Sequence, residues 1–317
     1  MFRKYNKITN SYSQKYINSI PQDATYIVQE KIHGANFSIM VDGDKNVSFA
    51  SRNKALDPTE NFYGYLAIAD ELAQKARSVD LEGPYTVFGE LFGGNYPHPD
   101  VEKQNIKSIQ KGVFYSPGIN FCAFDVYRFG NYLEVREANM LLARAGMLFS
   151  PTLLEGSLKQ CLEFKNEYQT TIPDLLSLPP IENNLCEGNI IRPQTTLYTK
   201  KGNRVILKNK NERFSERKRP PKTVRPPDSE VLLQFKSVFL EFVTENRLES
   251  VLSKEGHVSQ LDIGKVIKLM LQDVHESVAG ETVLVVKSLG NSDQKALSGF
   301  LTRKIAPMVI SRLKNET

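Results

Sequence analysis

The chain has 317 residues, of which 41 are Lys or Arg and 36 are Asp or Glu, so its formal charge is +5. This small excess permits a polyanionic partner without requiring one, and the length is sufficient for two domains. The three cysteines, Cys122, Cys161 and Cys186, lack the paired spacing of a zinc site or disulfide framework, which favours a reducing compartment. No apolar run is long enough for a signal peptide or a transmembrane helix, and we therefore expect a soluble, cytoplasmic protein.

The N-terminal two thirds of the chain predict a mixture of strands and helices. Alternating apolar residues before the turn residues Asp42-Gly43 predict a hairpin over 37–49. Helices are expected over 65–76 and 137–145, and further strands over 26–30, 85–90, 121–126, 189–192 and 204–208. Because these elements have no regular βαβ order, they predict an α+β fold.

A change in composition near residue 215 predicts a domain boundary. All 13 tyrosines lie at or before Tyr198, and residues 216–228 are rich in basic residues and proline, as in an extended linker. Beyond it, apolar residues within 231–243 and 263–274 follow the helical period, with Asp228 as a cap. We therefore predict a first domain over 1–215, a linker over 216–228 and a small all-α domain over 229–317.

The segment Glu30-Lys31-Ile32-His33-Gly34 places a lysine between a predicted strand and a glycine that lets the backbone turn closely round a ligand. An amine attacks phosphorus only when it is neutral. An unperturbed lysine has a pKa of about 10.4, so a catalytic lysine needs desolvation or neighbouring cations. The same short pattern also fits a lysine on the surface of a strand, and segments further along the chain must decide between the two.

Lys208 and Lys210 lie two residues apart on a strand and therefore project from the same face. They can place two ammonium groups by one phosphate, which would stabilise a pentavalent phosphorus and help to keep Lys31 neutral. Taken alone, Lys-x-Lys more often marks a solvated strand face. Residues 198–225 contain 11 Lys or Arg, and such a stretch is either a solvated linker or a path for a phosphate backbone.

Six segments follow one another in a fixed order: Lys31-Ile32-His33-Gly34, Ser51-Arg52, Phe88-Gly89-Glu90-Leu91, Phe124-Asp125, Glu187-Gly188 and Lys208-Asn209-Lys210. They resemble the nucleotidyltransferase motifs of covalent polynucleotide ligases. The histidine and the Phe-Asp pair make the set most similar to the RNA ligase 2 family of phage, viral and kinetoplastid editing enzymes. The resemblance implies an ATP-grasp-like nucleotidyltransferase domain of antiparallel sheets with flanking helices.

The resemblance also implies an ATP-dependent RNA ligase that joins 5′-phosphate and 3′-hydroxyl ends, at nicks in duplex RNA. In that reading Lys31 attacks the α-phosphorus of ATP and becomes lysyl-AMP, AMP passes to the RNA 5′-phosphate, and a 3′-hydroxyl then displaces AMP. Lys208, Lys210 and His33 would act with Lys31 as catalytic residues, His33 by hydrogen bonding the leaving pyrophosphate.

The remaining motif positions imply a nucleotide and metal site. Glu90 would lie near the ribose hydroxyls, Phe124 would stack on adenine, Asn36 and Arg52 would lie beside the ribose and phosphates, and Glu30 and Ile32 would flank Lys31 in the nucleotide site. Glu187 would lie near magnesium or manganese, which suits hard oxygen ligands. Each residue also has an ordinary alternative: surface salt bridges for Glu90, Glu187 and Arg52, core packing for Phe124, a strand-edge amide for Asn36 and a buried, backbone-bonded His33.

The expected partners are therefore ATP, a divalent metal and RNA, in a monomer of the cytoplasm or, for a viral enzyme, of the host cytoplasm. Two other functions stay open. One is a DNA ligase or mRNA-capping type nucleotidyltransferase, and the other is a non-catalytic RNA-binding relative that has lost its chemistry.

Overall fold

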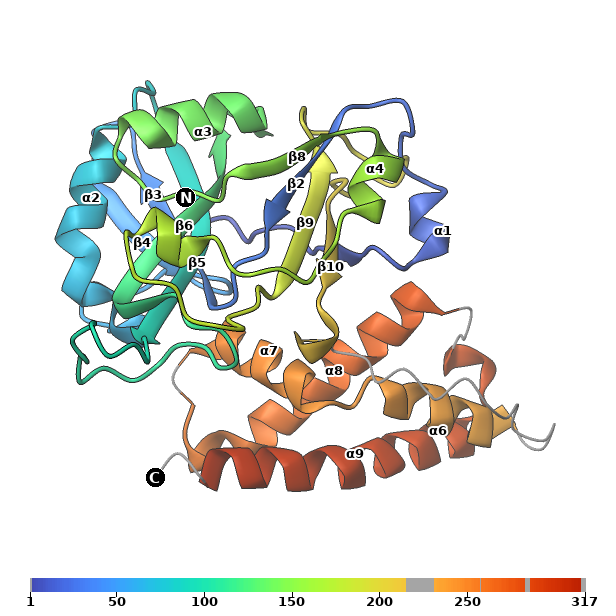
Figure 1. The fold of residues 1–317 in the computed structure, drawn as a ribbon. Helices are drawn as coiled ribbons and strands as arrows, with labels where there is room; N and C mark the ends of the chain where they lie inside the picture. Colours follow the sequence, from blue (N-terminus) through green and yellow to red (C-terminus); the bar gives the residue numbers. More distant parts are fainter. Residues whose placement is uncertain (1, 215–230, 257, 283–285, 315–317) are drawn as a thin grey trace. The chain divides into compact units, whose positions relative to one another are not determined.

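The computed structural model describes residues 2–214, 231–256, 258–282 and 286–314. The chain divides into two compact units, Met1–Arg213 and Phe214–Thr317 (Figure 1). The first unit mixes strands and helices and the second is helical, which confirms the predicted fold class. The predicted linker 216–228 lies outside the described residues, and the domain limits at 215 and 229 stay a prediction.

Two five-stranded sheets form the first unit. Sheet A contains, in spatial order, β1 (Thr9–Asn10), β10 (Leu207–Lys210), β9 (Gly188–Pro193), β2 (Tyr26–Glu30) and β8 (Thr152–Gly156). Sheet B contains β4 (Val47–Ser51), β3 (Ala35–Val41), β5 (Tyr85–Asn95), β6 (Ser116–Arg128) and β7 (Asn131–Tyr132). Neighbouring strands are antiparallel except for the short pair β1 and β10.

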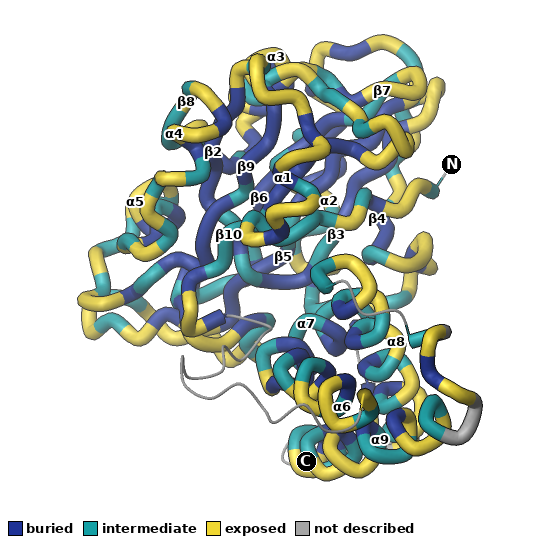
Figure 2. Tube along the Cα trace, turned by 90° about the vertical axis from the view of Figure 1, so that its right-hand side faces the viewer, coloured by how far each residue is buried: buried dark blue, intermediate teal, exposed yellow. Residues whose placement is uncertain are grey.

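Helices cover the outer faces of the two sheets. Sheet A packs against α1 (Gln14–Ile17) and α4 (Leu158–Glu163), and sheet B packs against α2 (Ala69–Arg77) and α3 (Val135–Arg144). Two short helices, α5 (Ile172–Leu175) and η2 (Glu212–Phe214), complete the unit. Figure 2 shows the strands β2, β6 and β9 buried, with exposed residues on the helices.

Side-chain alternation in β5 separates the core from a second, inner face of sheet B. Val87 belongs to the core beneath α2 and α3, whereas Phe88 belongs to a cluster that includes Ile190 of sheet A. Successive residues of a strand point to opposite faces, so the inner face of sheet B looks towards sheet A. Polar residues on this inner face are therefore held between the two sheets.

Several predicted boundaries were wrong; β5 and β6, for example, extend beyond the predicted 85–90 and 121–126. Residues Phe62–Ile68 form the 3-10 turn η1, in which Tyr63 and Gly64 have φ values of 50° and 80°, so α2 begins at Ala69 and not at residue 65. The last strand of sheet A occupies Leu207–Lys210 and not 204–208, because Arg204 enters a buried ion pair before the β-ladder starts. The periodicity of apolar residues predicts neither the positive φ values of Tyr63 and Gly64 nor the ion pair of Arg204.

The chain crosses from sheet A to sheet B through Lys31–Gly34, between the end of β2 and the start of β3. A Cβ atom on Gly34 would lie 2.0 Å from the carbonyl oxygen of Leu91 in β5. The crossover therefore passes too close to sheet B for any other residue type. The lysine of the first motif lies at the junction of the two sheets.

The second unit contains α6 (Val231–Glu241), α7 (Glu245–Glu255), α8 (Ile263–Glu281) and α9 (Asn291–Lys314), with short turns η3 (Gln260–Asp262) and η4 (Val286–Ser288). The two helices predicted from periodicity correspond to α6 and α8, whereas α7 and α9 were not predicted. Phe239, Val266 and Leu301 are fully buried in their shared core. No helix in the described part of the chain has both the length and the apolar character needed to cross a bilayer.

Candidate active site

The lysine of the first motif meets the other motif residues around one carboxylate. Lys31 Nζ donates a hydrogen bond of 2.6 Å to Glu187 Oε2, and Lys210 Nζ lies 2.9 Å from Glu187 Oε1. His33 Nδ1 lies 3.6 Å from Glu187 Oε2. Residues separated by more than 150 positions in the sequence thus share a single carboxylate that is 1% exposed.

The backbone around Glu187 holds this carboxylate in place. Gly188 has a φ of +136°, and a Cβ atom there would lie 2.2 Å from the carbonyl oxygen of Asn209, so the Glu-Gly pair requires its glycine. The N–H of Lys31 donates to the Gly188 carbonyl at 2.8 Å, and the N–H of Asn211 donates to the Glu187 carbonyl at 2.8 Å. Backbone hydrogen bonds therefore link the segment of Glu187 and Gly188 to the segments of Lys31 and Asn211.

Charge and burial act in opposite directions on Glu187. Burial would raise its pKa, but the charges of Lys210, Lys31 and His33 together outweigh burial and lower the pKa to about 2. Glu187 is therefore ionised throughout the neutral range. The sequence led us to expect cations next to Lys31, and the structure adds that its nearest partner is an anion which two cations share.

Glu90 lies on the inner face of sheet B, opposite Asn36 in the β3–β5 ladder. Burial raises its pKa to about 7, and the charge of Glu187 adds to the rise, whereas Lys31, Arg52 and the Asn36 amide lower it. Asn36 Nδ2 is also 3.4 Å from the Gly89 carbonyl. Lys31, Arg52 and Asn36 therefore all lie near the Glu90 carboxylate, and contacts of Glu90, Asn36 and Arg52 with a nucleotide stay predictions.

Lys208 precedes Lys210 by two residues on β10, where it pairs with Ile190 of β9 and with Asn10 of β1. The N–H of Ser11 donates to the Lys208 carbonyl at 2.9 Å. The N-terminal segment thus holds the strand that carries both motif lysines. Because the two lysines lie two residues apart on one strand, their side chains project from the same face, and a shared phosphate contact stays a prediction.

Phe124 lies half-buried on β6, where its ring makes an edge contact with Tyr5 at a centroid distance of 5.0 Å. It belongs to the cluster between the sheets, beside Ile190. This position combines core packing with partial exposure. Stacking on adenine stays a prediction for Phe124.

Asp125, the second residue of the Phe-Asp pair, forms a buried ion-pair network. Its Oδ2 lies 2.6 Å from Arg204 Nη1 and 2.8 Å from Arg192 Nη1, and it accepts a 2.6 Å hydrogen bond from the Tyr5 hydroxyl. Arg192 Nη2 also donates to the Phe124 carbonyl at 2.6 Å. Because Asp125 belongs to sheet B and Arg192 to sheet A, the network joins the two sheets behind the site.

The two residues flanking Lys31 are buried. Ile32 is 5% exposed and Glu30 is 2% exposed. The Glu30 carboxylate is directed to Thr170 and Thr171, which donate to it at 2.5 and 2.8 Å. A nucleotide contact of Glu30 or Ile32 stays a prediction, and the Glu30 side chain already has protein partners.

The donor set fits a hard divalent metal held by few protein ligands. Glu187 offers two carboxylate oxygens, and within the described residues no group of three or more His, Cys, Asp or Glu side chains gathers to form a cage. Magnesium and manganese sites of phosphoryl-transfer enzymes use one or two carboxylates together with water and phosphate oxygens. The single Glu187 carboxylate, which lies beside Lys31 and Lys210, therefore suits such an ion if phosphate oxygens and water complete its coordination.

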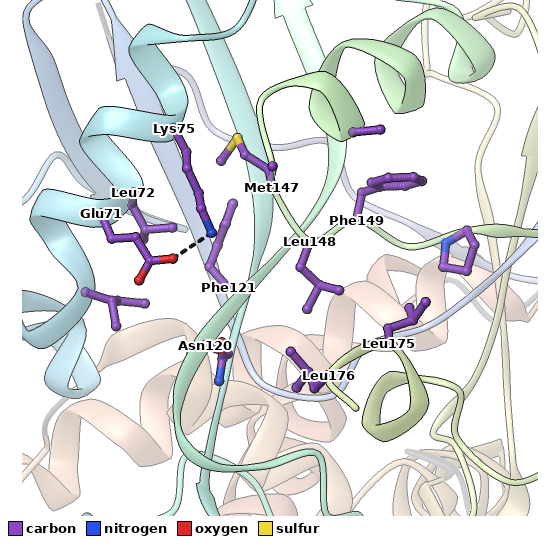
Figure 3. Close-up of a pocket in the computed structure, with 14 residues that line it drawn as sticks. Glu71, Leu72, Lys75, Asn120, Phe121, Met147, Leu148, Phe149, Leu175 and Leu176 are labelled. Carbon is purple, nitrogen blue, oxygen red and sulfur yellow. Dashed lines mark ion pairs between the residues drawn. The ribbon is translucent and has the colours of Figure 1, made fainter. Parts of the chain in front are cut away.

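A pocket of about 580 Å³ lies elsewhere in the first unit, and none of the residues predicted for the site lines it. Figure 3 shows it between Leu72 and Lys75 of α2, Phe121 of β6 and Leu175 and Leu176 at the end of α5. Its lining is mainly apolar.

The three cysteines are all free and buried, which agrees with the absence of a disulfide framework predicted from their spacing.

Residues 24–210 match the family model described as RNA ligase, which covers more than half of the chain. The chain belongs to the RNA ligase family. Residues 227–307 of the ligase match a second model, described as T4 RNA ligase 2 C-terminal. The resemblance drawn from the six motifs is therefore confirmed, and the protein is an RNA ligase.

Curated relatives of the ligase include two mitochondrial proteins of Trypanosoma brucei brucei. RNA-editing ligase 2 is 30% identical, with 91% of this chain and 88% of the relative covered, and RNA-editing ligase 1 is 30% identical, with 83% and 74% covered. A Naegleria gruberi RNA ligase solved with ATP and Mn is 15% identical with a TM-score of 0.48. That match covers 67% of the ligase and 57% of the Naegleria chain.

Several residues that shape the site in the ligase had no predicted role. Asp125 belongs to the Phe-Asp motif and Arg204 to the strand predicted over 204–208, but the sequence predicts a buried ion pair for neither. Tyr5 and the threonine pair at 170–171 carry no sequence signal of their own. Asn211 is also buried beside Glu187, and its Nδ2 has no hydrogen-bond partner. Only spatial proximity reveals these positions.

Proposed function

We propose that this ligase uses ATP to join a 5′-phosphate and a 3′-hydroxyl of RNA, preferably at nicks in a duplex, through lysyl-AMP and AMP-RNA intermediates. The observation that carries the proposal is the convergence of Lys31, Lys210 and Glu187, with Nζ–Oε distances of 2.6 and 2.9 Å. Covalent nucleotidyl transfer requires an amine beside a group that accommodates phosphate charge. The same cluster contains both.

In the first step, the neutral Nζ of Lys31 attacks the α-phosphorus of ATP. The N–P bond forms as the bond from the α-phosphorus to the bridging oxygen breaks, and pyrophosphate leaves with that electron pair. The amine proton passes to solvent or to the departing phosphate, because Glu187, with its pKa lowered to about 2, is too weak a base to retain it. Lys210 would then stabilise the charge that develops on the phosphoryl oxygens.

In the second and third steps, bonds to AMP are exchanged on RNA. A 5′-phosphate oxygen attacks the phosphorus of lysyl-AMP, which breaks the N–P bond and returns the amine to Lys31. The 3′-hydroxyl then attacks the RNA 5′-phosphorus and releases AMP, so that one phosphodiester bond is formed for each ATP consumed. Lys208 and His33 would contact the phosphates in these steps.

A divalent metal would be held by Glu187 together with phosphate oxygens and water. When bound, the ion supplies positive charge that neutralises the transferring phosphoryl group. Glu90, Asn36 and Arg52 would orient the ribose, and Phe124 would pack against the adenine. The motif positions support these assignments, as do the proximity of Glu90 to Lys31 and that of Asn36 and Arg52 to Glu90.

Basic residues near the end of the first unit support a nucleic-acid substrate. Lys200 and Lys201 are exposed and precede β10, the strand of Lys208 and Lys210. Cations that follow a phosphate backbone produce binding that weakens steeply with salt. Cytoplasmic location and a monomeric state are further parts of this proposal.

The proposal is tested by incubating the full chain with α-³²P-ATP and magnesium and resolving the protein by denaturing electrophoresis. We expect a labelled band that is stable to alkali and labile to acid, as a phosphoramidate is, and that chases into nicked RNA. Lys31→Arg, which keeps the charge and length but lacks a comparable nucleophile, should form no adduct. An unchanged adduct in this variant would overturn the assignment of Lys31.

Parallel incubations separate the other functions. An adduct from GTP but not from ATP would indicate capping-type chemistry, and equal sealing of all-DNA nicks would indicate a DNA ligase. Salt-sensitive binding of nicked RNA without any adduct would indicate a non-catalytic relative.

A further inference from the structure

The residue that precedes the proposed nucleophile has a side chain fully occupied by one short segment of the chain. Glu30 Oε1 accepts the Thr170 hydroxyl at 2.5 Å, and Glu30 Oε2 accepts both the Thr171 hydroxyl and the Thr171 N–H at 2.8 Å. Glu30 is 2% exposed. A carboxylate this deeply buried is retained only where donors replace its hydration, and here two threonines supply all three donors.

The threonine segment is itself fixed on several sides. The Thr170 N–H donates to the Asn184 carbonyl at 2.9 Å, and the Cys186 N–H donates to the Tyr168 carbonyl at 2.9 Å. Beyond Thr171, helix α5 ends at Leu175, which with Leu176 forms a wall of the pocket in Figure 3. The donors to Glu30 therefore belong to a well-anchored loop, which is hydrogen-bonded to the segment just before Glu187.

The backbone of Glu30 is also held. Its carbonyl accepts the Ser150 hydroxyl at 3.0 Å, and Glu30 pairs with Asn189 in the β2–β9 ladder. The next residue, Lys31, donates its N–H to the Gly188 carbonyl. The ladder aligns β2 with β9 and ends at Glu30, and the side-chain contacts of Glu30 link the end of β2 to a second segment of the chain, in addition to these backbone contacts.

We propose that the Glu30–Thr170–Thr171 cluster is a positioning device for Lys31, which sets the place of its Nζ relative to Glu187 and the bound α-phosphate. Glu30 thus serves the reaction through Lys31, and its side chain makes no contact with the nucleotide. The inference rests on the proposed function of Lys31 as the nucleophile. Because the attacking atom must lie near 3 Å from phosphorus, a displacement of about 1 Å at the exit of β2 lowers the rate about 100-fold.

Electrostatics support the geometric argument. Burial raises the pKa of Glu30, and the hydrogen bonds from Thr170 and Thr171 counteract that rise. The titratable groups that face Glu30 from other segments are Tyr115, Cys122, Tyr168 and Cys186, whose pKa values are themselves raised by burial, so they stay neutral over the pH range of the test. Without the hydroxyls, Glu30 takes up a proton at a higher pH. A neutral Glu30 accepts fewer strong hydrogen bonds, and the loop and β2 then lose their link.

The test compares Thr170→Val/Thr171→Val with Thr170→Ser/Thr171→Ser in the full chain. Valine keeps the shape and removes the hydroxyls, whereas serine keeps the hydroxyls. The single-turnover rate of adduct formation is measured against ATP concentration and against pH. We expect the valine variant to lose about 10- to 100-fold in maximal rate with half-saturation by ATP changed less than about threefold, and its acidic limb to move to higher pH. The serine variant should retain the rate within about threefold of the wild type.

A matched control is Thr86→Val, which makes the same substitution at a threonine of β5 that is 6% exposed and makes no contact with Glu30. It should keep the wild-type rate within about twofold. If the double valine variant does not fold, Thr171→Val is compared with Thr171→Ser; it removes one of the three donors to Glu30, and we expect a smaller loss of maximal rate in the same direction, with equal rates in the two variants overturning the positioning role.

The outcomes are distinguishable. No adduct in the wild type refutes the proposed function itself. An adduct in the wild type with equal rates in the valine variant overturns the positioning role. Equal slowing in the valine and serine variants, or a loss confined to half-saturation by ATP, also overturns it, because packing or nucleotide contact would then be the cause.

Discussion

The two units of the ligase bury different kinds of side chain. In the first unit, Asp125, Arg192 and Arg204 are each 4% exposed or less and share one ion-pair network, and Glu187 is buried among lysines. In the second unit, the core consists of apolar residues from four helices, and the buried Arg247 pairs with Asp273, which is 21% exposed. Burying charge is costly unless every partner is in place. Paired charges are concentrated between the two sheets of the first unit, and this unit therefore contains the proposed reaction site.

The largest expected effect tests the shared carboxylate. Glu187→Gln removes the charge that holds Lys31 and Lys210 together while keeping the size of the side chain. We expect adduct formation from ATP to fall at least about 1000-fold, equivalent to roughly 4 kcal/mol of transition-state stabilisation. Quench-flow labelling measures the rate. A loss below about tenfold would mean that the cluster of Lys31, Lys210 and Glu187 has a structural role. The buried charges of the first unit would then not indicate a reaction site.

The second prediction concerns the network that joins the sheets. Asp125→Ala leaves Arg192 and Arg204 buried without their carboxylate and should destabilise the first unit by about 3–5 kcal/mol. Urea unfolding monitored by tyrosine fluorescence measures this. The control is Glu155→Gln, which breaks the exposed pair with Arg136 at 2.7 Å and should cost less than about 1 kcal/mol. Equal costs for both would remove the distinction between buried and exposed charge.

The third prediction addresses the apolar core of the second unit. Leu301→Ala removes a fully buried side chain of α9 and should cost about 2–5 kcal/mol in the unfolding of that unit. Adduct formation from ATP should stay within about twofold of the wild type, since Glu187 and Gly188, the hydrogen-bond partners of Lys31 among the described residues, belong to the first unit. Calorimetry and α-³²P-ATP labelling on one preparation measure both effects. A loss of adduct formation in Leu301→Ala would show that the reaction at Lys31 also depends on the second unit.

The smallest expected effect is a pH dependence set by Glu90. Its pKa is raised from 4.5 to about 7, so between these values the folded ligase holds a proton that the unfolded chain releases, and stability falls as pH rises. Glu90→Gln removes this penalty. The variant should gain about 1–3 kcal/mol relative to the wild type between pH 5 and pH 8. Thermal unfolding at both pH values checks the sign, and a relative loss at pH 8 would contradict the assigned environment.

The candidate residues could be named from the sequence because they lie in short motifs. Lys31, His33 and Lys210 lie 2.6, 3.6 and 2.9 Å from the Glu187 carboxylate, and their roles in the reaction stay predictions. The contacts of Lys31 and Lys210 with the Glu187 carboxylate could not be predicted, because the Lys-x-Lys and Glu-Gly patterns do not indicate which charged groups touch one another. Thr170 and Thr171 could not be predicted at all, because a threonine pair in a loop has no periodicity.

The sequence by itself determined the fold class, the change from mixed to helical architecture, and the residues of the nucleotidyl-transfer motifs. These follow from local signals: side-chain periodicity, turn residues and short motifs. Only the tertiary structure decided where α2 and β10 begin, that Asp125 bridges the two sheets, and that Glu30 is held by a loop 140 positions away. These features depend on long-range burial of charge, whose partners are chosen by the packing of two sheets and not by neighbouring residues in the chain.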